Sequence, residues 1–460
     1  MKSGVILAAG DGSRAWPFCG IRQKATVPIC NVPMVRRLAL DLRAAGIEDL
    51  VVVTGHQAEA IRGCLGDLEG VRFVEQPQRR GPVDAALHGL SAVSGDVAAV
   101  CFGDIVTTAA SLCSAVQTFE GRRANALVLT APRPEGLTSS WTSLAIAPDG
   151  LLSGVGRAGP EHPRFAGFAI AKTDILKRYL ERNPGVLPSA GVGSMPPVEG
   201  DLAYTFELMR VDGIEVYTIP VTGFFVNVDK PWHIVEANYE AARDAFERMD
   251  KTVIGEGATI DDGADIADGA KLYLGPGAHI GKGCHIEGSI ALGAGARVVN
   301  GAILGRGVTV GAHTRCEDYC KVGSGSVLGA HGVVGHCAEF NGVMFDSVYI
   351  CHYSCMTALI GTRVDIGAAT VCGTWRFDDG TKPQAVEGRK EIPECHGECT
   401  FIGDDCRTGV NAIFMPGVKV GYYSCIGGGA MVYEDVPERT LLLPKQEQIR
   451  KPWGPERYGW

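Results

Sequence analysis

The first 230 residues alternate between two hydrophobic patterns. Short apolar runs that are typical of buried strands lie at residues 5–8, 50–54, 71–74 and 97–102. Apolar residues at helical spacing lie between them, at residues 35–45, 58–65 and 83–92. Repeated strand–helix units predict an α/β domain with a mostly parallel sheet and helices on both faces. Ligands of such folds bind at the carboxyl ends of the strands, so we expect the chemistry there.

A different pattern begins further along the chain. An apolar residue recurs every six positions at Leu274, Ile280, Ile286, Leu292, Val298, Leu304, Val310, Cys316, Val322, Leu328 and Val334. This period predicts a left-handed parallel β-helix of hexapeptide repeats, in which each six-residue side is a short strand plus a turn. The pattern breaks at residues 340–355 and 373–400, which we interpret as loops.

A helical pattern that starts at Pro231 separates these two regions. We therefore divide the chain into four parts. They are an α/β domain at residues 1–230, a linker helix at 231–251, a β-helix at 252–437 and a C-terminal tail at 438–460.

Charge and hydropathy exclude two classes of partner. The formal net charge of −9 argues against the basic face that nucleic-acid phosphates require. No apolar run approaches the ~18 residues of a membrane span, and the first apolar run follows the start so closely that there is no room for a signal peptide. We expect a cytoplasmic protein that binds neither nucleic acid nor membrane.

The 16 cysteines are then expected to be reduced thiols that serve mainly as small apolar fillers. Two Cys-His clusters, at residues 351–355 and 395–399, offer candidate zinc ligands. Neither has the C-x-x-C spacing of a zinc ribbon. Metal binding and buried packing are both open for them.

The strongest candidate site lies between residues 5 and 33. The first apolar run ends in the sequence GDGS at residues 10–13, where backbone N–H groups can close around phosphate oxygens. Arg14 and Lys24 add the full positive charges that a triphosphate requires. The loop matches neither the dinucleotide fingerprint G-x-G-x-x-G nor the Walker loop G-x-x-x-x-G-K-[ST].

This segment resembles the signature of the nucleotide-sugar pyrophosphorylases, L-A-A-G-x-G-[ST]-R followed by a proline, a lysine and P-[IV]-x-N-x-P. The matching positions are residues 7–14, Pro17, Lys24 and residues 28–33. The resemblance implies a Rossmann-like nucleotidyltransferase domain with Arg14 and Lys24 as catalytic residues. Arg14 would stabilise the pyrophosphate leaving group, and Lys24 would neutralise the α-phosphate and the attacking phosphate. The nucleotide-binding residues that it implies are Leu7, Ala8, Ala9, Gly10, Gly12 and Ser13.

The same resemblance implies a magnesium site. Asp104, directly after an apolar run, stands where the family has the carboxylate that holds Mg²⁺. Residues 225–232 resemble the family segment W-x-[DN]-[IV]-x-x-P, which places Asn227 as the second ligand. One carboxylate and one amide oxygen, with water and phosphate, suit Mg²⁺.

Residues 75–85 resemble the loop with which the family reads the base, Q-x-x-x-x-G-[TP]-x-x-A. Gln76 can present a donor and an acceptor to a pyrimidine edge, and the backbone at Gly81 and Pro82 can approach closely. UTP or dTTP is therefore the favoured nucleotide. A solvated turn is the alternative interpretation of this segment.

The acceptor side departs from the family pattern. Members that bind N-acetylglucosamine phosphate carry an asparagine and a glycine beside the hexose, where this chain has Phe165 before Gly167, and Thr142. Glu199 keeps a carboxylate that can bind sugar hydroxyls. We infer a more apolar acceptor pocket, so that the acceptor is a sugar 1-phosphate or a sugar-like phosphate of another kind.

The order of the two domains resembles the bifunctional N-acetylglucosamine-1-phosphate uridylyltransferase/glucosamine-1-phosphate acetyltransferase family, especially its archaeal-type members. In that family a histidine of the β-helix deprotonates the amine that attacks acetyl-CoA, and His352 lies in the corresponding neighbourhood. The tyrosine, glycine and aspartate that should follow it are missing from their positions. A purely structural β-helix that forms a homotrimer and a second, acetyl-CoA-dependent activity are both open.

We therefore expect a Mg²⁺-dependent enzyme that joins a nucleoside triphosphate and a sugar phosphate into a nucleotide-sugar and pyrophosphate. The alternatives are a bifunctional enzyme that also acetylates an amino-sugar phosphate, and a non-catalytic regulatory or scaffold homologue. Such a homologue would typically lose the loop lysine or the metal ligand, and this chain keeps both Lys24 and Asp104.

Overall fold

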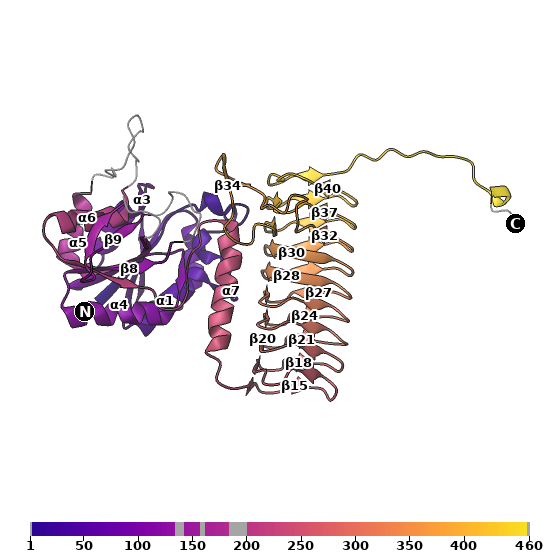
Figure 1. The fold of residues 1–460 in the computed structure, drawn as a ribbon, viewed down its shortest axis with the longest axis horizontal. Coiled ribbons are helices and arrows are strands. Elements are labelled where there is room, and N and C mark those ends of the chain that lie inside the picture. Colours follow the sequence, from indigo (N-terminus) through magenta and orange to yellow (C-terminus); the bar gives the residue numbers. More distant parts are fainter. Residues whose placement is uncertain (1, 134–141, 157–161, 184–199, 458–460) are drawn as a thin grey trace.

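The computed structural model of the protein describes residues 2–133, 142–156, 162–183 and 200–457. An N-terminal α/β domain lies beside a long column of stacked strands, and helix α7 (Pro231–Glu247) runs between them (Figure 1). As predicted, α7 begins at Pro231, which occupies its first turn.

The N-terminal domain is built on a seven-stranded sheet. Its order is β12 (Val216–Pro220), β8 (Ala126–Ala131), β11 (Arg164–Lys172), β6 (Val97–Phe102), β1 (Lys2–Ala8), β4 (Asp49–Thr54) and β5 (Val71–Glu75). Strand β11 is antiparallel to β6 and β8, and the other neighbours are parallel. The predicted mostly parallel sheet is confirmed, with the first apolar run of the chain forming β1 in the interior of the sheet.

Helices cover both faces of this sheet, because successive strand residues point to opposite sides. One face packs against α1 (Met34–Ala44), α2 (Ala58–Leu65) and α4 (Ala109–Arg122). The other packs against α3 (Gly81–Ser91), α5 (Thr173–Glu181) and α6 (Leu202–Val211). The three helices predicted from apolar spacing lie within two residues of their expected bounds. Shorter elements are β2 (Pro28–Ile29), β3 (Val32–Pro33), β7 (Ile105–Thr107), β9 (Leu144–Ile146), β10 (Leu152–Val155) and β13 (Phe225–Asn227).

The C-terminal column is the predicted left-handed parallel β-helix. One side is a ten-stranded parallel sheet of β15 (Thr259–Ile260), β18 (His279–Ile280), β21 (Arg297–Val298), β24 (Arg315–Cys316), β27 (Val333–Val334), β29 (Tyr349–Ile350), β31 (Asp365–Ile366), β36 (Arg407–Thr408), β39 (Cys425–Ile426) and β41 (Leu441–Leu442). The other sides form one sheet of sixteen strands from β14 (Val253–Ile254) to β40 (Met431–Val432). The column therefore ends at Leu442 rather than at residue 437.

The six-residue period sets the register of the column. Ile280 pairs with Val298, and Val298 pairs with Cys316, so that equivalent residues of successive coils are three repeats apart. These side chains are fully buried and stack along the interior. Cysteines such as Cys284 and Cys320 belong to the same core, and all sixteen cysteines are free thiols. The expectation that cysteines pack as small apolar fillers is confirmed for these two.

The predicted loop at residues 340–355 is wrong. Strands β28 (Glu339–Met344) and β30 (Cys355–Ile360) are continuous, and they pair over their whole length. Strand β28 also pairs with both β25 (Lys321–Val322) and β26 (Val327–Leu328), which belong to two different sides of the preceding coil. This corner of the coil is two residues shorter than the others, so that two sides merge into one strand. The six-residue period of the sequence therefore shifts here, although the chain stays within the column.

The second predicted loop does leave the column, between β32 (Val371–Cys372) and β35 (Thr400–Ile402). It contains an antiparallel hairpin of β33 (Gln384–Val386) and β34 (Arg389–Glu391), which the sequence did not predict. We call residues 373–399 the excursion. In Figure 1 the hairpin stands beside the upper end of α7, next to the N-terminal domain.

A further apolar core joins the two domains. It contains Phe18 of the N-terminal domain, Trp232 of α7, and Val386, Phe345 and Phe401 of the column and its excursion. No helix among the described residues has the length and apolar character needed to cross a membrane.

Candidate functional site

The glycine-rich loop follows β1 directly and closes against the chain that carries Lys24. Gly12 has a φ of 67°, in the left-handed region that favours glycine. A Cβ at this position would lie 2.6 Å from the Cβ of Lys24. A side chain on Gly12 would therefore displace Lys24, so that the glycine is required by this packing.

Four charged side chains meet beside this loop. The Lys24 ammonium contacts the Asp104 carboxylate and lies 4.0 Å from Oδ1 of Asp229. Nη2 of Arg14 lies 2.9 Å from the same Oδ1. Burial alone would lower the pKa of Lys24, but the carboxylates of Asp104 and Asp229 outweigh it and raise that pKa. Lys24 is thus held as a cation in a largely buried position.

The register of two short strands brings the predicted metal ligands together. Strand β13 pairs with β7 so that Asn227 lies opposite Ile105, and the amide of Val228 donates to the carbonyl of Asp104 at 2.8 Å. Oδ1 of Asn227 is buried and has no hydrogen-bond partner among the residues that the structure describes. A buried oxygen without a donor, next to a carboxylate, fits an oxygen-seeking cation such as Mg²⁺.

Asp229 is a functional candidate that the sequence analysis missed. Its side chain is 5% exposed and holds Arg14. The signal was present, because side chains two positions apart in an extended segment point the same way, and Asp229 follows Asn227 by two residues.

These residues line one cavity with a volume of about 610 Å³. All thirteen predicted catalytic, nucleotide-binding and metal residues lie on its wall: Leu7, Ala8, Ala9, Gly10, Gly12, Ser13, Arg14, Lys24, Gln76, Gly81, Pro82, Asp104 and Asn227. The sequence analysis missed Arg79, which also lines the cavity and pairs with Asp11 across it.

The predicted base-reading residue is buried and bonded within its own loop. Nε2 of Gln76 donates to the carbonyl of Gly81 at 3.2 Å and to Oδ2 of Asp84 at 2.7 Å. Gly81 opens α3 with a φ of 83°. The amide of Gln76 is therefore held in a fixed orientation at the wall of the cavity.

A smaller cavity of about 170 Å³ adjoins the first, and both are lined by Arg14, Asn227 and Asp229. Three of the predicted acceptor residues, Thr142, Phe165 and Gly167, line the smaller one. The fourth, Glu199, lies outside the described residues. The charged cluster therefore stands at the junction of the two cavities.

The smaller cavity combines aromatic walls with two charged residues that sequence reasoning missed. Asp201 accepts a hydrogen bond from Oγ1 of Thr142 at 2.6 Å. Arg164 is 5% exposed and lies over the ring of Phe225, 5.0 Å from its centroid. Burial lowers the pKa of Arg164 to about 10. No motif singled out these residues, because they lie far apart in the sequence and come to the wall of one cavity only in the folded domain.

The structure places His352 on a corner of the β-helix, far from this cluster in sequence and with an exposed side chain. Its Nδ1 lies 3.3 Å from Sγ of Cys351, and its ring packs edge-on against Tyr353. No carboxylate orients this ring among the described residues. Within one chain, His352 therefore lacks the orienting group that a general base requires.

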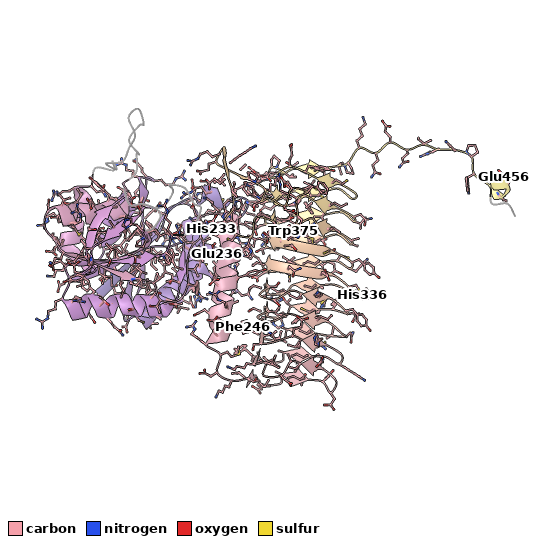
Figure 2. All side chains as sticks on the ribbon, viewed as in Figure 1. His233, Glu236, Phe246, His336, Trp375 and Glu456 are labelled. Carbon is pink, nitrogen blue, oxygen red and sulfur yellow. The ribbon has the colours of Figure 1, made fainter. Side chains whose placement is uncertain are left out.

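The excursion from the β-helix reaches the N-terminal domain at three glutamates. Glu387, between the hairpin strands, accepts a hydrogen bond from Oγ of Ser13 in the glycine-rich loop. Glu391 pairs with Lys230. Glu394 contacts Nε2 of His233 at 2.6 Å, and His233 lies on α7 at the upper junction of the domains (Figure 2).

Comparisons with known proteins agree with this architecture. The family model described as the MobA-like NTP transferase domain matches residues 4–169. The chain is 24% identical to the "Bifunctional protein GlmU" of Methanococcus vannielii, over 97% of this chain and 99% of that protein. It is 27% identical to a "Bifunctional sugar-1-phosphate nucleotidylyltransferase/acetyltransferase" of Sulfurisphaera tokodaii, over 94% of this chain and 97% of that protein.

Among solved structures, a UDP-glucose pyrophosphorylase from Acinetobacter baumanii matches with a TM-score of 0.45 and 18% identity, over 53% of this chain and 94% of that one. The suspected resemblance to sugar-1-phosphate nucleotidyltransferases that carry a C-terminal β-helix is confirmed by the relatives of nearly full length.

Proposed function

We propose that this chain, with its MobA-like NTP transferase domain and its similarity to GlmU proteins, is a sugar-1-phosphate nucleotidyltransferase. A phosphate oxygen of the acceptor attacks the α-phosphorus of a nucleoside triphosphate. The new P–O bond forms as the bond between the α-phosphorus and the β-phosphate oxygen breaks, and pyrophosphate leaves. The observation that carries the proposal is the position of the charged cluster, at the junction of a nucleotide-sized cavity and a smaller one.

The roles of the side chains follow from charge and position. Lys24 is held as a cation by Asp104 and Asp229, and it can contact the α-phosphate and the attacking phosphate. Arg14 pairs with Asp229, and its side chain is half exposed. It can therefore contact the pyrophosphate leaving group as negative charge develops on it. Catalysis of this kind needs only positioning and charge neutralisation.

Asp104 and Asn227 would hold Mg²⁺, with the buried Oδ1 of Asn227 gaining the partner that it lacks. When bound, the ion neutralises charge on the phosphates of the substrate. The glycine-rich loop supplies backbone N–H groups to those phosphates, since no side chain intrudes at Gly10 or Gly12.

The finer assignments rest on the sequence and on the relatives. The resemblance of residues 75–85 to the family's base-reading loop supports a pyrimidine nucleotide, UTP or dTTP. The aromatic rings of Phe165 and Phe225 beside Arg164 support a sugar-like phosphate with an apolar portion. We also propose a cytoplasmic homotrimer assembled through the β-helix.

The test is pyrophosphate release from each common nucleoside triphosphate with Mg²⁺, against a panel of sugar 1-phosphates. The Lys24→Ala variant serves as the blank, and loss of Lys24 should reduce the rate by on the order of 10²–10³. Release that needs one substrate pair and disappears in the variant supports the proposal. No release from folded protein over the whole panel would favour the regulatory or scaffold alternative.

The second activity of the bifunctional relatives is tested separately, with acetyl-CoA and amino-sugar phosphates. His352→Ala is the informative variant, because His352 is the residue that resembles the family's base. Thiol release that depends on His352 would establish the bifunctional alternative, with a neighbouring subunit as the source of the missing orienting group.

A further inference from the structure

The excursion ends in a turn that gathers three different metal-binding side chains. His396, Glu398 and Cys399 each offer one ligand atom, and these atoms all lie within 4.8 Å of one another. Nδ1 of His396 is 3.9 Å from Oε1 of Glu398, and the amide of Cys399 donates to the carbonyl of His396 at 3.2 Å. Within the described part of the chain, no other histidine, cysteine or acidic group of three or more converges in this way.

The turn is partly enclosed, with the side chain of Glu398 45% exposed at its outer edge. Cys399 is 2% exposed, and the side chain of His396 is 22% exposed. The ring of His396 packs edge-on against Tyr239 of α7, with the ring centroids 5.1 Å apart.

We propose that His396, Glu398 and Cys399 bind a zinc ion at the junction of α7 and the β-helix. Ligands of tetrahedral zinc are roughly 3.3–3.8 Å apart, as follows from Zn–N and Zn–S distances of about 2.0–2.3 Å. Small rotations of the three side chains would bring their ligand atoms, which now lie within 4.8 Å of one another, to these distances. A water molecule supplies the fourth ligand.

Charge balance favours a divalent cation here. As the ion binds, the thiol of Cys399 releases its proton to solvent and becomes a thiolate. The thiolate and the carboxylate of Glu398 then neutralise Zn²⁺, and His396 stays neutral. Mixed sulfur, nitrogen and oxygen donors select zinc over magnesium, which prefers oxygen alone. The site is therefore distinct from the one at Asp104 and Asn227.

The location gives the ion a structural role. The turn closely follows Glu394. One carboxylate oxygen of Glu394 contacts His233, and the other accepts a hydrogen bond from the indole N–H of Trp232 at 3.1 Å. A metal bound at residues 396–399 would fix the end of the excursion against α7. In this way it would hold the segment through which the β-helix contacts the glycine-rich loop.

The other Cys-His cluster does not share this geometry. Cys355 is exposed, and its thiol lies 3.7 Å from Oε2 of Glu339 rather than beside His352. It provides a matched control within the same domain.

The experiment measures zinc in the full-length protein, by elemental analysis after dialysis, and the absorption of the cobalt-substituted protein. We expect one zinc per chain and a thiolate-to-cobalt charge-transfer band. Cys399→Ser should abolish the band, and His396→Ala should weaken zinc binding more than about 100-fold, since even outer-shell partners of a metal cost 10–100-fold. The controls Cys355→Ser and Asp104→Asn should keep both signals.

A second measurement does not depend on the folding of the variants. Hydrogen exchange of residues 373–399 in the unmodified protein should be slower with zinc than after treatment with a chelator. Zinc content that is unchanged in folded Cys399→Ser protein, or exchange that does not respond to zinc, would overturn the proposal. Neither result bears on the nucleotidyltransferase proposal, which is tested by pyrophosphate release.

Discussion

The buried oxygen of Asn227 allows a sharp test of the metal site. In the absence of metal this Oδ1 has no partner among the described residues, and an unsatisfied buried polar group costs about 1–3 kcal/mol. Asn227→Leu replaces the amide with an apolar group of similar size. We therefore expect the metal-free N-terminal domain to be as stable as the unmodified one, or more stable by about 1–2 kcal/mol.

The same variant should lose its response to ligand. A ligand present at 100 times its dissociation constant stabilises a protein by about 2.7 kcal/mol, and the variant should gain far less from Mg²⁺ and nucleotide. Its rate of pyrophosphate release should fall by on the order of 10²–10³. Urea unfolding with and without Mg²⁺ and nucleoside triphosphate measures the first effect, and pyrophosphate release measures the second.

Asn238 is a matched control for this substitution. It is also buried, but its Oδ1 accepts from the amide of Cys30 at 2.8 Å and its Nδ2 donates to the carbonyl of Ile234 at 2.9 Å. Asn238→Leu leaves these groups unpaired and should destabilise the metal-free protein by about 1–3 kcal/mol for each. If Asn227→Leu destabilises the metal-free protein equally, or keeps full activity, the assignment of Asn227 as a metal ligand is wrong.

Three further predictions concern single carboxylates. Glu387→Ala removes a negative charge that contacts Ser13 in the glycine-rich loop. Because this charge repels the phosphates of the substrate, the KM for nucleoside triphosphate in steady-state assays should fall up to roughly fivefold. An unchanged or higher KM refutes this prediction. Burial raises the pKa of Asp41 to about 6, above its unfolded value of 3.8, so stability is lost as pH rises between these values. Asp41→Asn should therefore stabilise the protein at pH 8 and have no effect near pH 3, measured by urea unfolding. Burial alone would raise the pKa of Glu394, but pairing with His233 outweighs burial and lowers that pKa below 4.5. The ionised carboxylate should therefore make the protein more stable than its Glu394→Gln variant above pH 4.5. This difference in the free energy of unfolding should vanish as the pH falls through the lowered pKa.

Local patterns were enough to predict most of the fold. Apolar runs and helical spacing identify β1 and the helices around it, because the strands are buried on both faces of the sheet and each helix buries one face against it. The six-residue period identifies the β-helix, because every coil repeats the same inward position. The period also misled at residues 340–355, where a corner two residues shorter joins two sides into one strand. The spacing of apolar positions shows only that the period shifts by two residues. The strand pairing that explains this shift involves residues far apart in the sequence.

The candidate site was likewise predicted only in part. Sequence motifs placed all thirteen of the proposed nucleotide-side residues on one cavity wall. They did not predict Arg164 and Asp201 on the acceptor side, nor the contact between Ser13 and Glu387, which are 374 residues apart in the chain. The first two residues meet only when distant parts of the N-terminal domain fold together, and the contact of Ser13 depends on how the excursion folds back over that domain. No local pattern carries that information.

The most direct measurement follows the oxygen atoms of the reaction. A sugar 1-phosphate labelled with oxygen-18 in its phosphate is incubated with the matching nucleoside triphosphate and Mg²⁺, and the products are analysed by mass spectrometry. Attack on the α-phosphorus keeps every label in the nucleotide-sugar and leaves the pyrophosphate unlabelled, and Lys24→Ala abolishes both products. Label in pyrophosphate or inorganic phosphate, or turnover that persists in Lys24→Ala, would contradict the account.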